Sequence, residues 1–277
     1  MKLGGPVFEK YTNPYEWIKA VKKEGYKASY CPIGINCSDE IIEEYRKTAL
    51  REKIIIAEVG AWSNPLSPDI EERKKAIEKC KKSLYLAEKI GANCCVNISG
   101  SRGKKWDGPD KKNLTEETFD MIVETVREII DEVKPQNTYY TLETMPWMYP
   151  DSGDSYLKLI KAIDRKSFAV HFDPVNLINS PEKYFFNDIL IKDFVKKLGP
   201  YIKSCHAKDI IIGEKLTLHL DETRPGLGGL DYRTLLKELN KLDKNLPLML
   251  EHLPSKEEYI KAKEYIEKIA FEEGIEL

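Results

Sequence analysis

Four side chains that can bind a metal stand at the ends of four strand-like segments in the second half of the chain. They are Glu143 in T-Y-Y-T-L-E-T-M-P, Asp173 in F-A-V-H-F-D-P-V-N-L, His206 in I-K-S-C-H-A-K-D and Glu251 in L-P-L-M-L-E-H-L-P. In the Asp173 segment, apolar and polar side chains alternate as expected of a strand, and Pro174 ends the pairing because proline has no amide hydrogen. Each strand delivers its last polar group to an edge of the sheet, so we expect the four side chains to converge.

The chemistry of these four groups favours a metal site. Three carboxylates and an imidazole cannot share a cavity bare, because like-charge repulsion raises their pKa values until some are protonated. A divalent cation removes that cost, and a set of oxygen ligands with one nitrogen suits Mn²⁺, Mg²⁺ or Co²⁺ better than a structural zinc site. A single strand-end Glu or Asp is more often a helix cap or an ion-pair partner, but four on successive strands reverse that expectation.

Strand-like and helix-like segments alternate along the whole chain and must position these groups. Apolar runs such as 54–59, 94–98 and 246–251 predict buried strands, and helical stretches such as 70–90, which ends at Gly91, lie between them. Counting gives about eight strands and eight helices, which favours a single (β/α)₈ barrel that spans residues 1–277. The four groups would then stand on its fifth to eighth strands. No G-x-G-x-x-G supports a dinucleotide-binding fold.

Two loops that follow predicted strands are longer than usual. Residues 99–114 are polar and rich in glycine, and residues 210–230 contain the alternating K-L-T-L-H-L, which indicates a hairpin. In a (β/α)₈ barrel the loops after the strands surround the active site. We therefore expect both loops to form the rim of a pocket.

Composition limits the partners and the compartment. Lys plus Arg is 44 and Asp plus Glu is 46, a formal net charge of −2, which gives no electrostatic footprint for nucleic acid or an acidic membrane. The six cysteines show no C-x-x-C spacing, which indicates neither a zinc-thiolate site nor a disulfide framework. No signal peptide and no run of about 20 apolar residues is present, so the cytoplasm is the expected location.

The motifs L-E-T-M-P, H-F-D-P-V-N-L, S-C-H-A-K-D and L-E-H-L together resemble the xylose isomerase-like TIM-barrel superfamily, in its sugar phosphate isomerase/epimerase branch. The resemblance implies that Glu143, Asp173, His206 and Glu251 bind one divalent metal. Mn²⁺ is the first expectation, with Mg²⁺, Co²⁺ and Zn²⁺ left open. In the epimerases, the glutamates matching Glu143 and Glu251 also move a proton on opposite faces of the sugar.

The activity that the resemblance implies is a sugar isomerase or epimerase that transfers a proton through a metal-stabilised enediolate. A lyase or dehydratase working through the same intermediate is the alternative. An endonuclease IV-like phosphodiesterase is less favoured, because the chain has four histidines and no basic excess. Ketose 3-epimerases carry a His three residues after the matching Asp, where this chain has Asn176.

Several residues around the four groups are candidates for contacting a small-molecule carbohydrate, with a homo-oligomer left open. Lys208 shares a strand face with His206 and either holds a substrate oxygen or pairs with Asp209. Trp62 and Trp147 follow strand ends and either form apolar walls for a sugar ring or pack beneath loops. Asn176 is a candidate because it replaces the epimerase His. His171 is another, and a satisfied core histidine is the alternative for it. Arg224 and the run Ser101–Lys105 either grip a phosphate or lie in solvent.

Overall fold

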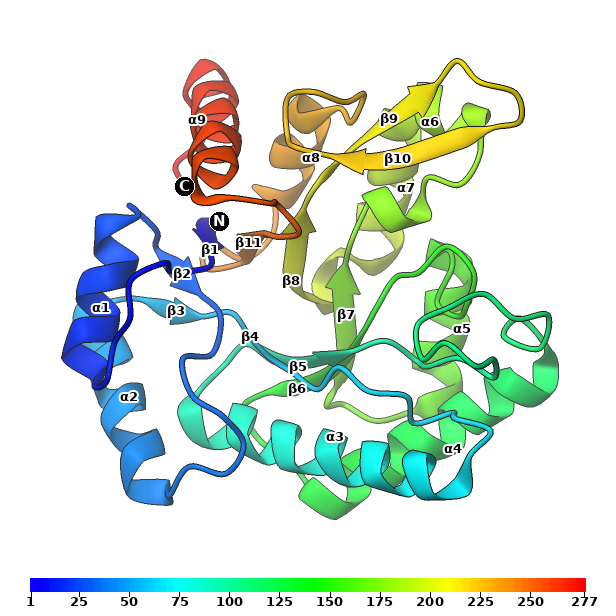
Figure 1. The fold of residues 1–277 in the computed structure, drawn as a ribbon, viewed down its shortest axis with the longest axis horizontal. Helices are drawn as coiled ribbons and strands as arrows, with labels where there is room; N and C mark the ends of the chain where they lie inside the picture. Colours follow the sequence, from blue (N-terminus) through cyan, green and yellow to red (C-terminus); the bar gives the residue numbers. More distant parts are fainter.

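Parallel strands form a ring at the centre of the molecule, and helices surround it (Figure 1). The computed structural model describes all 277 residues. Nine strands pair in the order β3-β2-β1-β11-β8-β7-β6-β5-β4. Only Ala57 separates β3 from β4, which stand at the two ends of this order, so the sheet is nearly closed. The predicted single-domain (β/α)₈ barrel is confirmed.

The strands are β1 (Lys2–Gly5), β2 (Ala28–Ser29), β3 (Ile55–Ile56), β4 (Glu58–Gly60), β5 (Cys94–Asn97), β6 (Tyr139–Glu143), β7 (Phe168–Phe172), β8 (Ile202–Ala207), β9 (Asp209–Gly213), β10 (His219–Thr223) and β11 (Pro247–Leu250). The α-helices are α1 (Pro14–Lys23), α2 (Asp39–Glu52), α3 (Ile70–Ile90), α4 (Glu116–Val133), α5 (Gly153–Ile163), α6 (Pro181–Phe185), α7 (Asn187–Leu198), α8 (Tyr232–Leu239) and α9 (Lys256–Glu272). The single strand expected over 54–59 is thus interrupted into β3 and β4.

Short local signals set the helix boundaries. The side chain of Asn13 accepts a hydrogen bond from the Glu16 amide at the start of α1, and Ser255 does the same for Glu258 at the start of α9. Gly91 ends α3 with a φ of 78°, a left-handed conformation that glycine adopts without strain. The two side-chain caps set where α1 and α9 begin, and Gly91 sets where α3 ends.

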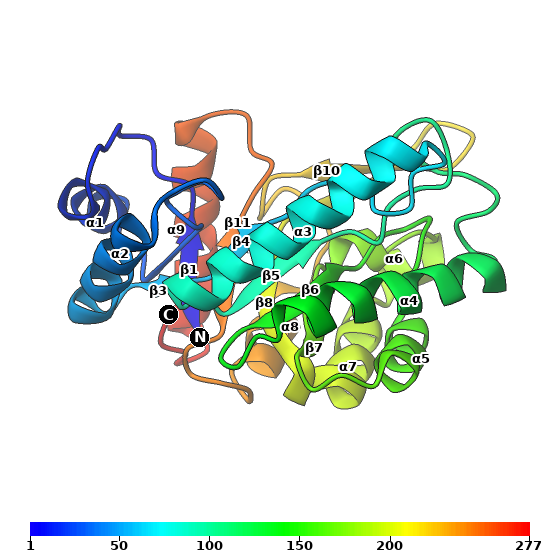
Figure 2. The same ribbon diagram turned by 90° about the horizontal axis from the view of Figure 1, so that it is seen from below.

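The main hydrophobic core lies between the ring of strands and the outer helices, in one cluster of 59 buried residues. Successive helices pack against each other around the outside, as Figure 2 shows for α2, α3 and α4. None of the helices is both long enough and apolar enough to cross a membrane.

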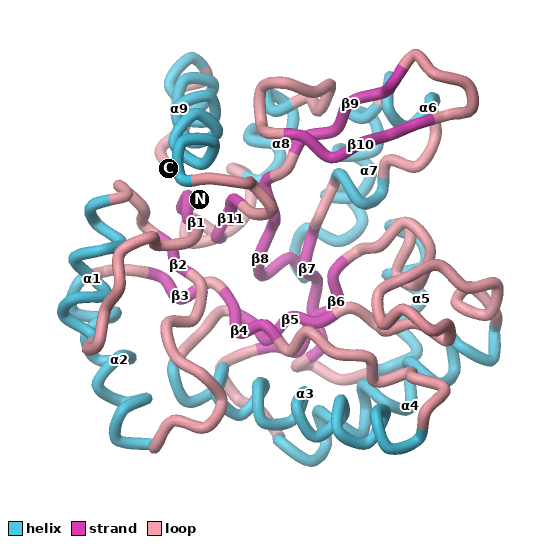
Figure 3. Tube along the Cα trace, in the orientation of Figure 1, coloured by secondary structure: helices cyan, strands magenta, loops and turns pink.

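A two-stranded antiparallel hairpin, β9–β10, extends beyond the ring (Figure 3). It confirms the hairpin predicted in the long loop after β8. Most of the alternating K-L-T-L stretch lies at its tip rather than in a strand, and β9 instead uses the apolar run Ile210–Ile212. The hairpin continues almost directly from β8, so it rises from the same end of the barrel as His206.

Candidate active site

The structure brings together the four strand-end side chains that the sequence singled out. Glu143 is the last residue of β6, Asp173 and Glu251 directly follow β7 and β11, and His206 is the penultimate residue of β8. One donor atom from each residue lies within 4.8 Å of the others. His206 Nδ1 is 3.0 Å from Glu143 Oε1 and 2.9 Å from Glu251 Oε1. The four groups therefore form one compact cluster at the carboxyl ends of adjacent strands.

Hydrogen bonds to the backbone fix the Asp173 carboxylate. Its Oδ1 accepts hydrogen bonds from the amides of Val175 and Asn176 at 2.9 and 3.2 Å, and the Thr144 hydroxyl binds the Asp173 backbone. The side-chain amide of Asn176 donates to Glu143 Oε1 at 3.3 Å. Only Asp173 Oδ2 is left free to face the cluster.

The Lys208 ammonium lies among the three carboxylates. Its Nζ is 2.6 Å from Glu251 Oε1, 2.8 Å from Asp173 Oδ2 and 3.8 Å from Glu143 Oε1, and its side chain is only 2% exposed. The cluster thus contains its own positive charge, in the position where the sequence predicts a divalent cation.

The alternative partner of Lys208, Asp209, has a different role. Its carboxylate accepts hydrogen bonds from the backbone amides of Gly226, Gly228 and Leu230, at 2.9, 3.1 and 2.9 Å. Asp209 therefore organises the loop between β10 and α8, and no ion pair forms between it and Lys208.

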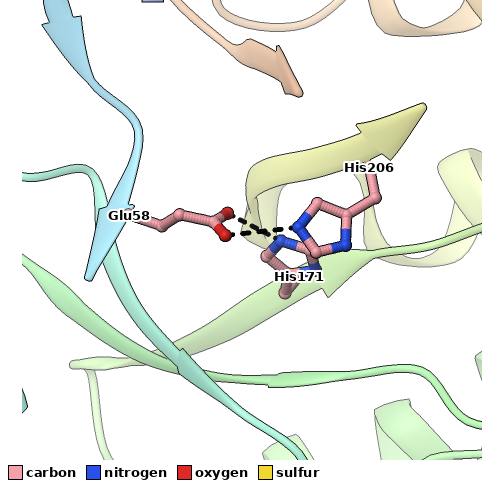
Figure 4. A group of neighbouring side chains, drawn as sticks. All are labelled: Glu58, His171 and His206. Carbon is pink, nitrogen blue, oxygen red and sulfur yellow. Dashed lines mark hydrogen bonds and ion pairs between the residues drawn. The ribbon is translucent and has the colours of Figure 1, made fainter. Parts of the chain in front are cut away.

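A fourth carboxylate, Glu58, faces the other nitrogen of the His206 ring (Figure 4). Glu58 Oε1 is 3.2 Å from His206 Nε2, and Glu58 Oε2 is 2.9 Å from both His171 Nε2 and the Ser204 hydroxyl. Glu58 therefore fixes the imidazole of His206 so that its other nitrogen, Nδ1, faces Glu143 and Glu251. The sequence interpretation missed Glu58, whose only local signal is one carboxylate inside the apolar run 54–59.

His171 lies beneath the cluster, which corrects the expectation that it contacts the substrate. Its side chain is completely buried, and its ring packs edge-on against His206 with centroids 4.1 Å apart. It does not line the cavity above the cluster. His171 is thus a core histidine, the alternative that the sequence left open: its Nε2 is paired with Glu58, and its Nδ1 is buried without a hydrogen-bond partner.

Burial raises the pKa of every carboxyl group here, and neighbouring charges then decide the outcome. For Glu143, the positive charges of Lys208 and His206 outweigh burial and lower the pKa. Burial raises the pKa of Asp173 to about 7, although Lys208 acts in the opposite direction. Burial would lower the pKa of His206, but Glu251, Glu58 and Glu143 raise it well above its usual value. His206 and Lys208 together offset part of the negative charge of these carboxylates.

The donor atoms fit a divalent ion. Asp173 Oδ2 and Glu251 Oε1 are buried and have no aligned hydrogen-bond partner, although the Lys208 ammonium is close to both. Two oxygen ligands on opposite sides of one Ca²⁺-sized ion lie at most about 5 Å apart, so four donor atoms that all lie within 4.8 Å of one another can contact one ion. Three carboxylates and one imidazole are also donors that Mn²⁺ and Mg²⁺ accept.

A cavity of about 500 Å³ lies above the cluster. Glu143, Glu251, Lys208 and Asn176 contribute to its lining, and so do both predicted tryptophans, Trp62 and Trp147. The two long loops form part of its rim as expected, through Trp106 and Asp107 from the first loop and Glu222 from the hairpin. Trp106 was not predicted, because it stands in a charged, glycine-rich stretch.

The basic residues that the sequence offered as phosphate ligands do not reach this cavity. Arg224 pairs with Glu258 at 2.8 Å, and Arg102 donates to Thr118 and Glu117 on α4. Neither lines the cavity, and no other arginine does. The expectation that Arg224 contacts the substrate is therefore corrected: its guanidinium is held at the start of α9.

The chain belongs to the xylose isomerase-like TIM barrel family, whose sequence model matches residues 18–269. This confirms the resemblance seen in the four motifs. No curated protein sequence matches the chain.

Solved structures share the fold at low sequence identity. A D-tagatose 3-epimerase-like protein is 20% identical with a TM-score of 0.71, over 98% of this chain and 97% of that one. A xylose isomerase-like TIM barrel protein from Mycobacterium smegmatis, in complex with magnesium, is 19% identical with a TM-score of 0.66, over 93% and 88%. Endonuclease IV from Thermus thermophilus is 10% identical with a TM-score of 0.71, over 98% and 100%. Other matching structures include sugar epimerases and a probable dehydratase.

Proposed function

We propose that this protein is a divalent-metal-dependent sugar epimerase or isomerase. The observation that supports it is the convergence of Glu143, Asp173, His206 and Glu251 at the floor of a cavity, in a barrel family whose solved relatives include sugar epimerases. These four residues would hold the metal, and Mn²⁺ is the ion that we propose. Its substrate is a small carbohydrate, and its six free cysteines suit a reducing cytoplasm.

The metal, when bound, would polarise a carbonyl group of the sugar and make the neighbouring C–H acidic. One of Glu143 and Glu251 then removes that proton, and the sugar becomes an enediolate. The other glutamate returns a proton on the opposite face, which gives an epimer, or a proton returns to the adjacent carbon, which gives an aldose–ketose isomer. Asn176 and Lys208 carry N–H donors at the floor of the cavity that hold substrate oxygens.

A dehydratase is the second candidate, and Lys208 is the feature that favours it. Its ammonium lies at the floor of the cavity, 2.6 Å from Glu251. An ammonium in this position can donate a proton to a departing hydroxyl group, so that the same enediolate loses water instead of regaining a proton.

An endonuclease IV-like phosphodiesterase is a weaker proposal. Two of the four histidines, His171 and His206, are buried below the cavity, and the cavity has no arginine to bind a phosphodiester backbone.

The proposal is tested by hydrogen exchange into keto-sugars and keto-glycosides in heavy water, followed by NMR. We expect loss of one substrate C–H signal that requires Mn²⁺ and stops when the ion is chelated. Glu143→Gln and Glu251→Gln keep the side-chain size but remove the basic charge, and general base catalysis is typically worth about 10²–10⁴ in rate. Exposed Glu257→Gln on α9 serves as the control. Unchanged exchange in both active-site variants, each loaded with metal, would show that the base lies elsewhere.

A further inference from the structure

The walls of the cavity carry information about the substrate that the four floor residues do not. This inference rests on the proposed function, because it concerns the sugar bound above the same four residues. The cavity of about 500 Å³ falls in the range of about 300–1,000 Å³ typical of sites for drug-sized ligands, which are larger than one six-carbon sugar. The volume leaves room for a second group beside the reacting ring.

Three tryptophans provide an apolar wall for such a group. Trp62, Trp106 and Trp147 come from the three successive loops after β4, β5 and β6, and all three line the cavity. They are 36%, 39% and 38% exposed, whereas Trp17, the other tryptophan of the chain, is completely buried in the core. Large indole rings left partly open at the edge of a cavity favour an apolar ligand surface, such as the C–H face of a sugar ring.

The wall is also held in place. The indole N–H of Trp147 donates to the backbone carbonyl of Asp107 at 2.8 Å, which joins the loop after β6 to the loop that carries Trp106. Fixing the ring before binding lowers the entropy cost of ordering it around a ligand. Trp106 and Trp147 therefore belong to one connected surface.

The charges that line the cavity disfavour an anionic substrate. Five carboxylates line it, from Glu58, Asp107, Glu143, Glu222 and Glu251, and their five negative charges exceed the four positive charges of Lys208, a protonated His252 and a divalent ion. The cationic groups are already occupied: Lys208 lies between Glu251 and Asp173, and His252 lies 3.2 Å from Glu222. A phosphate dianion here would meet a surplus of negative charge.

Three basic residues of the neighbouring loops are also paired with acidic side chains outside the floor. Lys105 lies 3.1 Å from Asp107, Arg102 binds Glu117, and Arg224 binds Glu258. A site that binds phosphate usually presents a free arginine fork or a cluster of backbone amides. No arginine lines this cavity, and its one lining lysine, Lys208, lies among carboxylates.

We infer that the substrate is an uncharged glycoside or disaccharide, whose reacting sugar lies over Glu143 and Glu251 and whose second ring or aglycone packs on Trp106 and Trp147. The first ring meets the hydrogen-bonding floor, and the second ring contributes affinity through apolar contact. A single free ketose would leave the tryptophan wall uncovered, and a sugar phosphate would add the charge that the cavity disfavours.

The test is equilibrium binding to the Mn²⁺-loaded full chain, by calorimetry and by tryptophan fluorescence, to which three of the four tryptophans contribute from the cavity. The probes are fructose, fructose 6-phosphate, glucose 6-phosphate and the neutral disaccharides cellobiose, maltose and sucrose. We expect at least one disaccharide to bind about tenfold more tightly than fructose and than either phosphate. Trp106→Ala and Trp147→Ala should weaken disaccharide binding about tenfold and fructose binding by less than about threefold. Phe271→Ala, an exposed aromatic substitution at the far end of α9, is the matched control.

Three results would overturn the inference. The first is tighter binding of a sugar phosphate than of any disaccharide, and the second is no preference for a disaccharide, or no detectable binding of one, at about 10 mM. The third is an equal loss of affinity for disaccharides and for fructose in the tryptophan variants. Failure of the proposed function is a separate result. Exchange seen only with sugar phosphates would leave the metal-dependent chemistry intact and refute the inference. A disaccharide preference without any C–H exchange would support the inference about the substrate and refute the proposed epimerase or isomerase chemistry.

Discussion

Replacement of Lys208 by methionine tests whether its ammonium stands in for a metal ion. In the structure this ammonium is the closest positive charge to both Asp173 Oδ2 and Glu251 Oε1, at 2.8 and 2.6 Å. Lys208→Met keeps most of the side-chain volume but leaves the carboxylates without that charge. Breaking a buried charge pair by removing one partner costs about 3–5 kcal/mol, and protonation of Asp173, whose pKa is already raised to about 7, holds the cost near the lower end.

The assay is thermal unfolding with and without a divalent ion. A loss of about 3 kcal/mol lowers Tm by roughly 6–12 °C in a chain of this size class, so the chelated variant should melt that far below the wild type. A saturating divalent ion supplies the missing charge, and we expect the difference to shrink to less than about 3 °C. The variant should also bind the ion more tightly, because no ammonium has to be displaced.

The matched control is Lys203→Met on the same strand, β8. The Lys203 ammonium lies 4.5 Å from the centroid of the Tyr139 ring and contacts none of the four clustered residues. We expect its Tm to change by less than about 2 °C, with or without metal. Equal stability of the chelated Lys208→Met protein and the wild type, or a Tm difference that metal does not reduce, would show that the Lys208 ammonium does not take the place of a metal ion.

Two further predictions concern groups behind the site. Glu58→Gln should weaken Mn²⁺ binding about 10–100-fold, as measured by calorimetry, because the variant no longer fixes the His206 ring. Ser204→Ala removes a contact to Glu58 but none to His206, and it should weaken Mn²⁺ binding less. Equal Mn²⁺ affinities in the wild type and both variants would contradict the role of Glu58. Tyr156→Phe should lower the free energy of unfolding by about 1–3 kcal/mol in urea, because the single proton of the Tyr156 hydroxyl lies between the carbonyls of Leu142 and Ala169, 2.6 and 2.9 Å away, and links β6 to β7. An unchanged midpoint would show that water replaces the hydroxyl.

The sequence was sufficient to predict the barrel and the four clustered residues, because both depend on local patterns. Alternating strands and helices indicate a parallel barrel, and the carboxyl ends of its strands meet at one face. A polar residue at the end of an apolar run therefore has a predictable location. Glu143, Asp173, His206 and Glu251 all carry this local signal.

Glu58 could not be predicted in the same way, because its role depends on distant residues. Its partners His171 and His206 lie 113 and 148 positions further along the chain. A carboxylate inside an apolar strand indicates an unusual environment, but not which group it contacts. The side of His206 that faces Glu143 and Glu251 is set by this contact and is visible only in three dimensions.

Lys208 and Arg224 show the limit of reading side-chain roles from position alone. The two-residue period placed Lys208 on the correct face, but a substrate oxygen and Asp209 were equal alternatives as its partner. In the fold, Asp209 binds the backbone amides of the 226–230 loop instead, and Lys208 lies among the carboxylates of the cluster. Arg224 stands in a plausible rim loop, and Glu258 of α9 takes its guanidinium. Competition among partners decides such cases, and the competitors come from separate elements.

Direct measurement of metal binding tests the central claim, that Glu143, Asp173, His206 and Glu251 form one metal site. The chelated protein is titrated with Mn²⁺, and free ion is followed by electron paramagnetic resonance. We predict one ion per chain in the wild type, and at least a tenfold weaker affinity in Asp173→Asn, which keeps the shape of the side chain but removes its charge; Asp193→Asn on α7 is the control and should match the wild type. Equal, stoichiometric binding by wild type and Asp173→Asn, or no binding by the wild type, would contradict the account.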